Sequence, residues 1–414
     1  MKLKHLAVMT MAASMSLPVV ADDTFTFNGY GRAGLSFSQD GGEQPARPEL
    51  GNTSLNHATG RLGAENDTFL ELDFNKEVAE DWKVQIMLAG GMDPQLNDEQ
   101  DFETKLRQFN VQAKGVMLGG EEIFWAGKRY YQRHDIHWLD FYYLNNSGYG
   151  VGVEYIPLGD GLLSAALLNE DAVVAIDGDV TNTTDVQYNK IDLRYAMNIG
   201  LEFAAVIGAS DPTDEQDQLL DIEGNGYFLT AAYSANGFFG GENGYNKLVA
   251  QYSDGSMGHM AYSNGTVTNK INENVTDGDI DSAYRLIYFG VADVNPNIEV
   301  GYSIVYANAD RKDADDSSII SLVTRPAYHW NETNTTLLEL GYADEDRDGK
   351  STNLYKAIVA QEWSPESSLM SRPSIRVYGG AFGGDAAEDV DIDNEFRAGV
   401  QFEAWWYAPR GITQ

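Results

Sequence analysis

Four segments of the chain place an aromatic side chain among charged and amide side chains at alternate positions. The rings are Tyr30, Phe69, Tyr245 and Trp405, and the charged residues two positions away from them are Arg32, Glu71, Lys247 and Glu403. Side chains two positions apart share one face of a β-strand. On a water-filled face, such a ring can stack on the apolar C–H face of a sugar, worth about 1 kcal/mol by analogy with aromatic pairs. The same spacing also fits rings packed under an inward loop, and both interpretations stand on spacing alone.

Other motifs that could perform chemistry lack the context they need. Residues 29–34 satisfy G-x-G-x-x-G, but the segment alternates like a strand and no helix follows it. Residues 344–349 resemble the start of a calcium loop, but Tyr355 stands where a glutamate is required, so only a loose surface cation site stays open. His134 and His137 fit hydrogen-bonding roles in a loop better than metal ligation. We therefore expect no enzyme activity, no cofactor and no metal site.

Period-2 alternation predicts that β-strands position these side chains. It is clearest over residues 24–38, 68–75 and 394–406. The whole chain contains about eighteen such segments. They start near Thr24, Thr59, Trp82, Thr104, Glu121, Tyr149, Gly161, Val186, Ile199, Gly226, Gly244, Ser282, Asn297, Asp316, Thr333, Asn353, Met370 and Asp393.

The connections between these segments alternate in length. Those after odd-numbered strands are mostly long, namely 39–58, 92–103, 131–148, 171–185, 211–225 and 254–281, and the others are mostly short. Short turns at one rim and long loops at the other are typical of an outer-membrane β-barrel. Acidic residues gather in the long connections, as in 211–223, which predicts a solvated rim and also a field favouring cations at the entrance.

The N-terminus predicts export. Lys2 and Lys4 precede an apolar stretch over 6–20, and Ala21 offers a cleavage site, so 1–21 is expected to be a signal peptide rather than a membrane anchor. No later stretch is apolar enough for a spanning helix, so a membrane location requires a closed barrel. We expect the barrel to occupy 22–406 and a C-terminal extension of uncertain role to occupy 407–414.

Composition narrows the class further. The formal net charge is -35, from 28 basic and 63 acidic residues, which argues against nucleic acid as a partner. Cysteine is absent, so disulfides and thiolate metal sites are excluded. The 414 residues, rich in Tyr, Phe and Gly, suit one large barrel or two to three soluble domains.

Residues 125–143, WAGKRYYQRHDIHWLDFYY, resemble the maltoporins, the maltodextrin-specific porins of Gram-negative outer membranes. Further matching stretches are 27–34, 61–72, 110–114, 147–148, 152–154, 244–252, 371–377 and 403–406. The resemblance implies a homotrimer of eighteen-stranded antiparallel barrels, each with its third loop, 131–148, folded into the bore.

The resemblance also implies a sugar-binding site. An aromatic "greasy slide" would fall on Tyr30, Phe69, Tyr142, Tyr245, Met370 and Trp405, and a polar track on Arg32, Arg61, Glu71, Arg107, Arg133, Asp135 and Asp140. Met370 departs from the Trp usual there and offers a weaker, less directional contact. Phe102 is the one aromatic residue in the second loop, where the family lends a Trp to the neighbouring subunit.

The implied function is facilitated diffusion of maltose and maltodextrins through the outer membrane. A porin for another oligosaccharide or for general small solutes is the alternative, and a secreted soluble glycan-binding protein or enzyme is a third. Some family members serve phage as receptors through their outer loops, and for this chain that stays open.

Overall fold

The computed structural model describes residues 24–41, 55, 58–65, 67–92, 103–176, 179–216, 224–237, 244–262, 280–312, 314–347, 349–389 and 392–407. The expected signal peptide, Phe102 and all of the expected C-terminal extension except Tyr407 lie outside the described residues.

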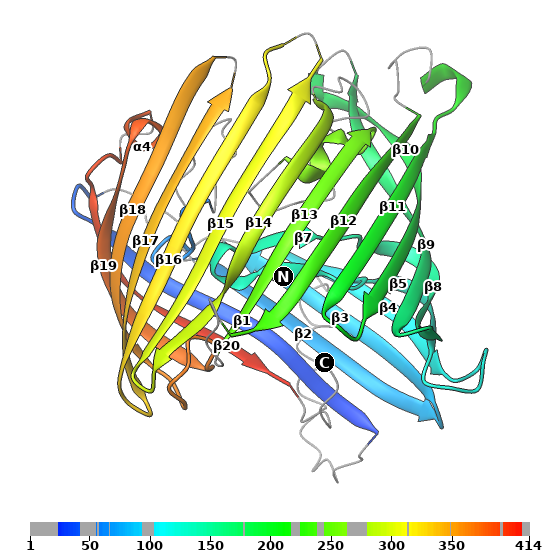
Figure 1. The fold of residues 1–414 in the computed structure, drawn as a ribbon, viewed down its shortest axis with the longest axis horizontal. Coiled ribbons are helices and arrows are strands. Elements are labelled where there is room, and N and C mark those ends of the chain that lie inside the picture. Colours follow the sequence, from blue (N-terminus) through cyan, green and yellow to red (C-terminus); the bar gives the residue numbers. More distant parts are fainter. Residues whose placement is uncertain are drawn as a thin grey trace, which may run out of the picture.

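Within the described residues, eighteen antiparallel strands form one closed sheet, and each strand pairs with the next along the chain (Figure 1). The strands are β1 (Phe25–Ser38), β2 (Thr68–Ala79), β3 (Trp82–Met92), β4 (Glu103–Lys114), β5 (Ile123–Arg129), β8 (Gly148–Leu158), β9 (Gly161–Ile176), β10 (Asp179–Met197), β11 (Leu201–Asp211), β12 (Asn225–Asn236), β13 (Tyr245–Gly255), β14 (Ile280–Asn295), β15 (Ile298–Arg311), β16 (Ser317–Asn331), β17 (Asn334–Arg347), β18 (Lys350–Trp363), β19 (Ser374–Gly383) and β20 (Phe396–Trp406). The last strand, β20, pairs with β1 and closes the ring. The predicted all-β barrel is confirmed.

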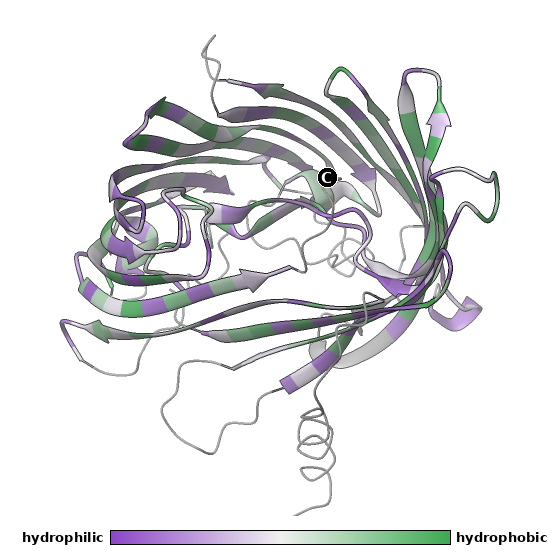
Figure 2. Cartoon of the chain, turned by 90° about the horizontal axis from the view of Figure 1, so that it is seen from below, coloured by the Kyte–Doolittle hydropathy of each residue, from purple (hydrophilic) through white to green (hydrophobic). Residues whose placement is uncertain are grey.

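The two faces of each strand differ in polarity, as the alternation predicts. In β1, Leu35 and Phe37 point outward and are exposed, whereas Asn28, Arg32 and Ser36 point inward and are buried. Figure 2 shows this alternation as bands of hydrophobic and hydrophilic residues along the strands. An apolar outer face around a closed ring suits the hydrocarbon region of a membrane, because every strand edge is paired. No helix among the described residues is long and apolar enough to cross a membrane.

The segment 130–147, between β5 and β8, lies inside the ring of strands. It contains β6 (His134–Ile136), a 3-10 helix (His137–Leu139) and β7 (Phe141–Leu144). Three strands hold it through hydrogen bonds: Arg194 of β10 donates to the Gln132 carbonyl, Gln251 of β13 donates to the Tyr143 carbonyl at 2.8 Å, and Trp138 donates to Ser303 of β15 at 3.1 Å. Because these strands occupy different parts of the ring, the segment must cross its interior.

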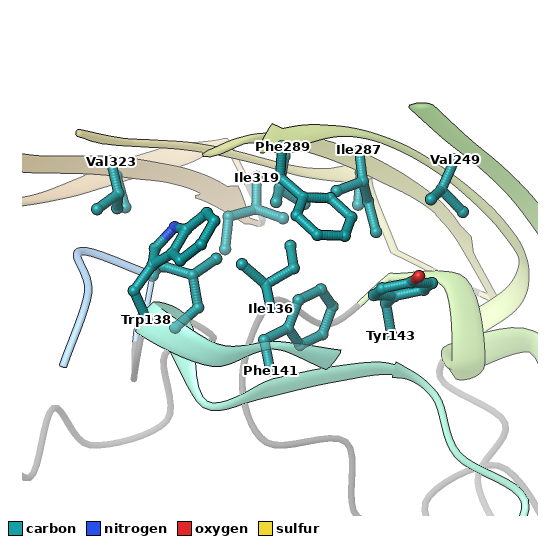
Figure 3. Close-up of a cluster of buried hydrophobic side chains, with 14 of the residues drawn as sticks. Ile136, Trp138, Phe141, Tyr143, Val249, Ile287, Phe289, Ile319 and Val323 are labelled. Atoms are coloured by element: carbon teal, nitrogen blue, oxygen red, sulfur yellow. The ribbon is translucent and has the colours of Figure 1, made fainter. Parts of the chain in front are cut away.

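A hydrophobic core lies between this segment and one wall of the barrel. Ile136, Trp138 and Phe141 of the segment face Ile287 and Phe289 of β14 (Figure 3). All five side chains are buried. The inner face of this wall is therefore apolar and covered, whereas the inner face of β1, β2 and β20 is polar and carries the partly exposed side chains of Tyr30, Phe69, Glu71 and Trp405.

The first long connection also enters the barrel over residues 58–65. Lys356 donates to the carbonyls of Gly60 and Leu62, and the Leu62 amide donates to the Glu339 carboxylate at 2.9 Å. Gly60 has φ +89°, and a Cβ there would lie 2.5 Å from a Glu339 oxygen, so only glycine fits. The prediction that a strand starts at Thr59 is wrong, because Lys356 and Glu339 hold residues 58–65 inside the barrel and β2 starts only at Thr68.

Most connections follow the predicted alternation of length, with four differences. The long connection predicted over 171–185 is wrong, because β9 continues to Ile176 and β10 starts at Asp179. The connection 364–373, after an even strand, is long, and the predicted strand start at Met370 falls within it. It is held inside by the Leu369 amide, which donates to Glu299 of β15 at 2.6 Å. The connections 312–316 and 348–349, after odd strands, are short, whereas 384–395 contains the single-turn helix α4 (Asp385–Glu388).

Candidate functional site

The strands β20, β1 and β2 arrange rings and charges in two rows across the barrel wall. Trp405 is paired with Tyr30, and Tyr30 is paired with Glu71. In the adjacent row, Glu403 is paired with Arg32, and Arg32 with Phe69. All six side chains are on the inner face, because they share strand parity with the buried polar residues Asn28, Asp73 and Gln401. Each of the three strands therefore carries one ring and one charged group, two positions apart, on the inner face.

The rings of these rows are close to one another and to cations. Tyr30 and Phe69 have ring centroids 6.1 Å apart, and Arg32 lies over the Phe69 ring at 5.4 Å from its centroid. Trp405 meets His137 edge to face, with 5.1 Å between their centroids. Burial lowers the pKa of His137, although the Glu403 carboxylate opposes this shift. The imidazole beside Trp405 is therefore neutral near pH 7.

Glu403 is the centre of a buried hydrogen-bond network beneath the rings. Its carboxylate is contacted by the Tyr30 hydroxyl at 2.9 Å, Arg61 at 3.2 Å, His137 at 3.3 Å, Arg372 at 2.7 Å and Arg376 at 3.1 Å. Only 2% of the Glu403 side chain is exposed. A buried carboxylate is tolerated when several donors surround it, so the network fixes the position of the Tyr30 hydroxyl.

Two predicted polar-track residues, Arg32 and Arg61, belong to this buried network. Both are 7% exposed. Arg32 donates to Asp67 at 3.0 and 2.9 Å, and Arg61 donates to the Tyr30 hydroxyl at 2.8 Å and pairs with Glu65. Their N–H groups are largely engaged with protein partners.

Four of the remaining polar-track residues, Arg133, Asp135, Asp140 and Glu71, interact electrostatically with Tyr142 of β7. The Arg133 guanidinium lies over the Tyr142 ring at 4.6 Å from its centroid. Burial raises the pKa of the Tyr142 phenol well above its usual value, Arg133 lowers it, and Asp135, Asp140 and Glu71 raise it.

Asp140 and Arg133 connect this cluster to its surroundings. Asp140 also lies 3.6 Å from Arg32, which joins the cluster to the rows on β1 and β2. Arg133 lies over a second ring, Tyr130, at 3.6 Å from its centroid. Arg133 and Arg107 are both partly exposed.

The structure places three predicted site residues at the edges of this assembly. Arg107 occupies a bulge of β4, between positions paired with Met87 and Leu88 of β3. Tyr245 is 40% exposed and shares its strand face with Lys247. Met370 is 36% exposed and lies in the connection 364–373.

Sequence reasoning missed the network that supports the rings. It recognised Glu403 only as a neighbour of Trp405, and it gave no role to Arg372, Arg376 or Tyr130. Parity along β20 does place Glu403 inside the barrel, but its partners come from distant segments. No group of three or more His, Cys, Asp or Glu side chains that could hold a metal ion occurs in the described part of the chain.

A closed barrel that is apolar outside and lined inside by rings and charges defines a membrane-spanning β-barrel channel. A model of the LamB porin family matches residues 25–406, and the chain belongs to that family. Family membership and the barrel together make it an outer-membrane channel and not an enzyme.

Two relatives align over almost their whole length. The maltoporin of Photobacterium profundum is 35% identical over 97% of this chain and 98% of its own. The maltoporin of Hahella chejuensis is 35% identical over 98% of each chain.

Solved structures with little sequence identity share the fold. Acinetobacter baumannii OccAB2 aligns with a TM-score of 0.53 and 9% identity, over 94% of this chain and 99% of its own. Pseudomonas aeruginosa OccK8 (OprE) aligns with a TM-score of 0.52 and 10% identity, over 93% and 98% of the two chains.

Proposed function

We propose that this protein lets maltose and maltodextrins diffuse passively across the outer membrane along the row of rings. The observation that supports this most directly is the set of aromatic and charged side chains on the inner face of β20, β1 and β2, continued by Tyr142 at the inward segment. A pyranose has apolar C–H faces and a rim of hydroxyls, so it can contact rings and charged groups at the same time. The two relatives named as maltoporins support this ligand class.

Several weak sites in a row suit transport better than one strong site. A sugar must bind firmly enough to enter and weakly enough to leave each position. Each stack is worth about 1 kcal/mol, so successive rings can exchange a sugar without trapping it.

The polar track has two parts in this proposal. Arg133, Arg107, Glu71, Asp135 and Asp140 are partly or largely exposed, so they can bond directly to sugar hydroxyls. The buried pair Arg32 and Arg61 instead holds the rings and the inward segments in place.

Single-channel recording in planar bilayers tests the proposal. Maltohexaose at millimolar concentration should block the ion current through the protein reversibly. Absence of block would exclude a maltodextrin channel and favour a general porin. Liposome swelling with maltose, sucrose and other sugars of similar size then separates a maltodextrin channel from a channel for another oligosaccharide.

Assembly and processing complete the proposal. We expect a homotrimer in outer-membrane lipid that runs as a heat-modifiable band on gels, with Asp22 as the first residue of the mature chain. Mass spectrometry of the purified protein would check both the cleavage after Ala21 and the presence of 407–414.

A further inference from the structure

Three rings of the aromatic row each have a guanidinium group over one face. The pairs are Arg32 over Phe69, Arg133 over Tyr142 and Arg372 over Trp405, at 5.4, 4.6 and 4.6 Å from the guanidinium carbon to the ring centroid. At these distances the cation is attracted by the ring quadrupole. A sugar that stacks on one of these rings must therefore use the opposite face.

Arg372 differs from the other two because its guanidinium bonds to backbone carbonyls as well as to a carboxylate. Its side chain is fully buried. Its Nε donates to Glu403 at 2.7 Å, its Nη2 forms an ion pair with the same carboxylate at 2.6 Å, and its Nη1 donates to the carbonyls of Leu369 and Ser371 at 3.1 and 2.7 Å. With these bonds in place, the guanidinium plane beside Trp405 cannot reorient.

Trp405 is consequently held from two directions. Arg372 covers one face of the indole, and His137 of the inward segment meets it edge to face at 5.1 Å. The ring remains partly exposed. A partly exposed ring that is already immobile loses little conformational entropy when a ligand stacks on it.

We propose that Arg372 is a positioning residue that fixes the Trp405 ring for sugar stacking, and thereby sets the sugar affinity at this end of the row. The inference rests on the proposed function and deepens it. Arg372 itself does not touch the sugar. Without it, a sugar that binds must immobilise the indole, and the binding constant falls about two- to tenfold, mainly through faster dissociation.

Two substitutions separate the stacked plane from the charge. Arg372→Lys keeps a positive charge next to Glu403 but loses the planar group that stacks on the indole and the fork that binds two carbonyls. Arg372→Met removes both. We expect maltohexaose to bind about two- to tenfold more weakly to both variants, with dissociation faster in current-noise analysis. A wild-type constant for Arg372→Lys would show that charge alone matters and would overturn the proposal.

A double-mutant cycle tests whether the effect passes through Trp405. Arg372→Lys combined with Trp405→Ala should bind maltohexaose as Trp405→Ala alone does, since no ring is left to position. If Arg372→Lys weakens binding by the same factor with and without the indole, Arg372 acts by another route and the proposal fails.

The matched control is Arg397→Met on the same strand as Trp405. Arg397 is also buried, pairs with Glu395 at 2.8 Å and lies over a ring, Phe382, that is outside the aromatic row. It should leave maltohexaose binding unchanged. If the wild-type channel is not blocked by maltohexaose, the proposed function and this inference both fail. If the wild type is blocked and the Arg372 variants bind equally well, only this inference fails.

Discussion

At the scale of single residues, the site contains exposed side chains that can contact a sugar and buried side chains that hold the exposed ones in place. Tyr142 and Arg133 are partly exposed and face the passage, whereas Arg61 and Glu403 are buried beneath the rings. A buried network of ionised groups is costly to disrupt, because removing one partner leaves another unpaired. Changes at exposed positions should therefore alter sugar binding, and changes at buried positions should alter stability as well.

Tyr142→Ala should weaken maltohexaose binding about fivefold, which is the loss of one aromatic stack of about 1 kcal/mol. Titration of the current block in planar bilayers measures this. The control is Tyr306→Ala, which removes an exposed ring from the outer face of β15 and should leave the block unchanged. Equal effects of the two substitutions would show that Tyr142 is not in contact with sugar.

Met370→Trp should strengthen maltohexaose binding about three- to tenfold, because an indole offers a larger and flatter surface than a thioether. Met370 is 36% exposed, so a larger side chain has room. Met370→Leu serves as the control and should bind like the wild type. Unchanged or weaker binding in Met370→Trp would place position 370 outside the sugar path.

At the scale of elements, the inward segment 130–147 depends on packing against the apolar wall. Its backbone is bonded to β10 and β13, and its Trp138 indole N–H donates to Ser303 of β15. The indole also meets Phe289 at 6.3 Å between ring centroids. Trp138 is therefore the largest of several buried side chains that fix the segment against the wall.

Trp138→Ala should destabilise the folded protein by about 3–5 kcal/mol, since it opens a cavity in this core. The segment should then fluctuate, so we expect larger and noisier ion currents and a lower temperature for the shift between folded and unfolded bands on a gel. Outward-facing Trp330→Ala is the control for loss of an indole. A quiet channel of wild-type conductance would show that the backbone bonds alone hold the segment.

The strands were predicted from alternation and the inward course of 131–148 from the family resemblance, whereas the inward courses of 58–65 and 364–373 were not predicted. Alternation is a local signal, so strand starts such as Trp82 and Gly161 agree with the structure. The inward course of 58–65 depends on Lys356 and Glu339, which are almost 300 positions away, and no local pattern reveals it. For the same reason the partners of Glu403 could not be read from the sequence, although its inward orientation could.

At the scale of the whole molecule, the net charge of -35 sets the long-range field. Clustered negative charge raises the local concentration of cations and lowers that of anions near a channel entrance. The effect weakens over the Debye length, which is about 10 Å at 0.1 M salt and 3 Å at 1 M.

The channel should therefore conduct potassium in preference to chloride. The zero-current potential across a bilayer with a KCl gradient measures this preference and should have the sign of a cation-selective pore. Raising the ionic strength on both sides should reduce the selectivity as the field is screened. An anion-selective potential at low salt would show that the arginines of the passage outweigh the acidic surface.

The two rows of rings and charges span the seam at which β20 joins β1. Tyr30 and Glu403, bonded across it at 2.9 Å, are 373 positions apart in the chain. Neither row exists before the final strand docks, so the recognition surface and the sealed cylinder arise in the same event. A polypeptide arrested short of closure would have neither a leak-proof wall nor a sugar path, and sugar block is thus a readout of complete biogenesis.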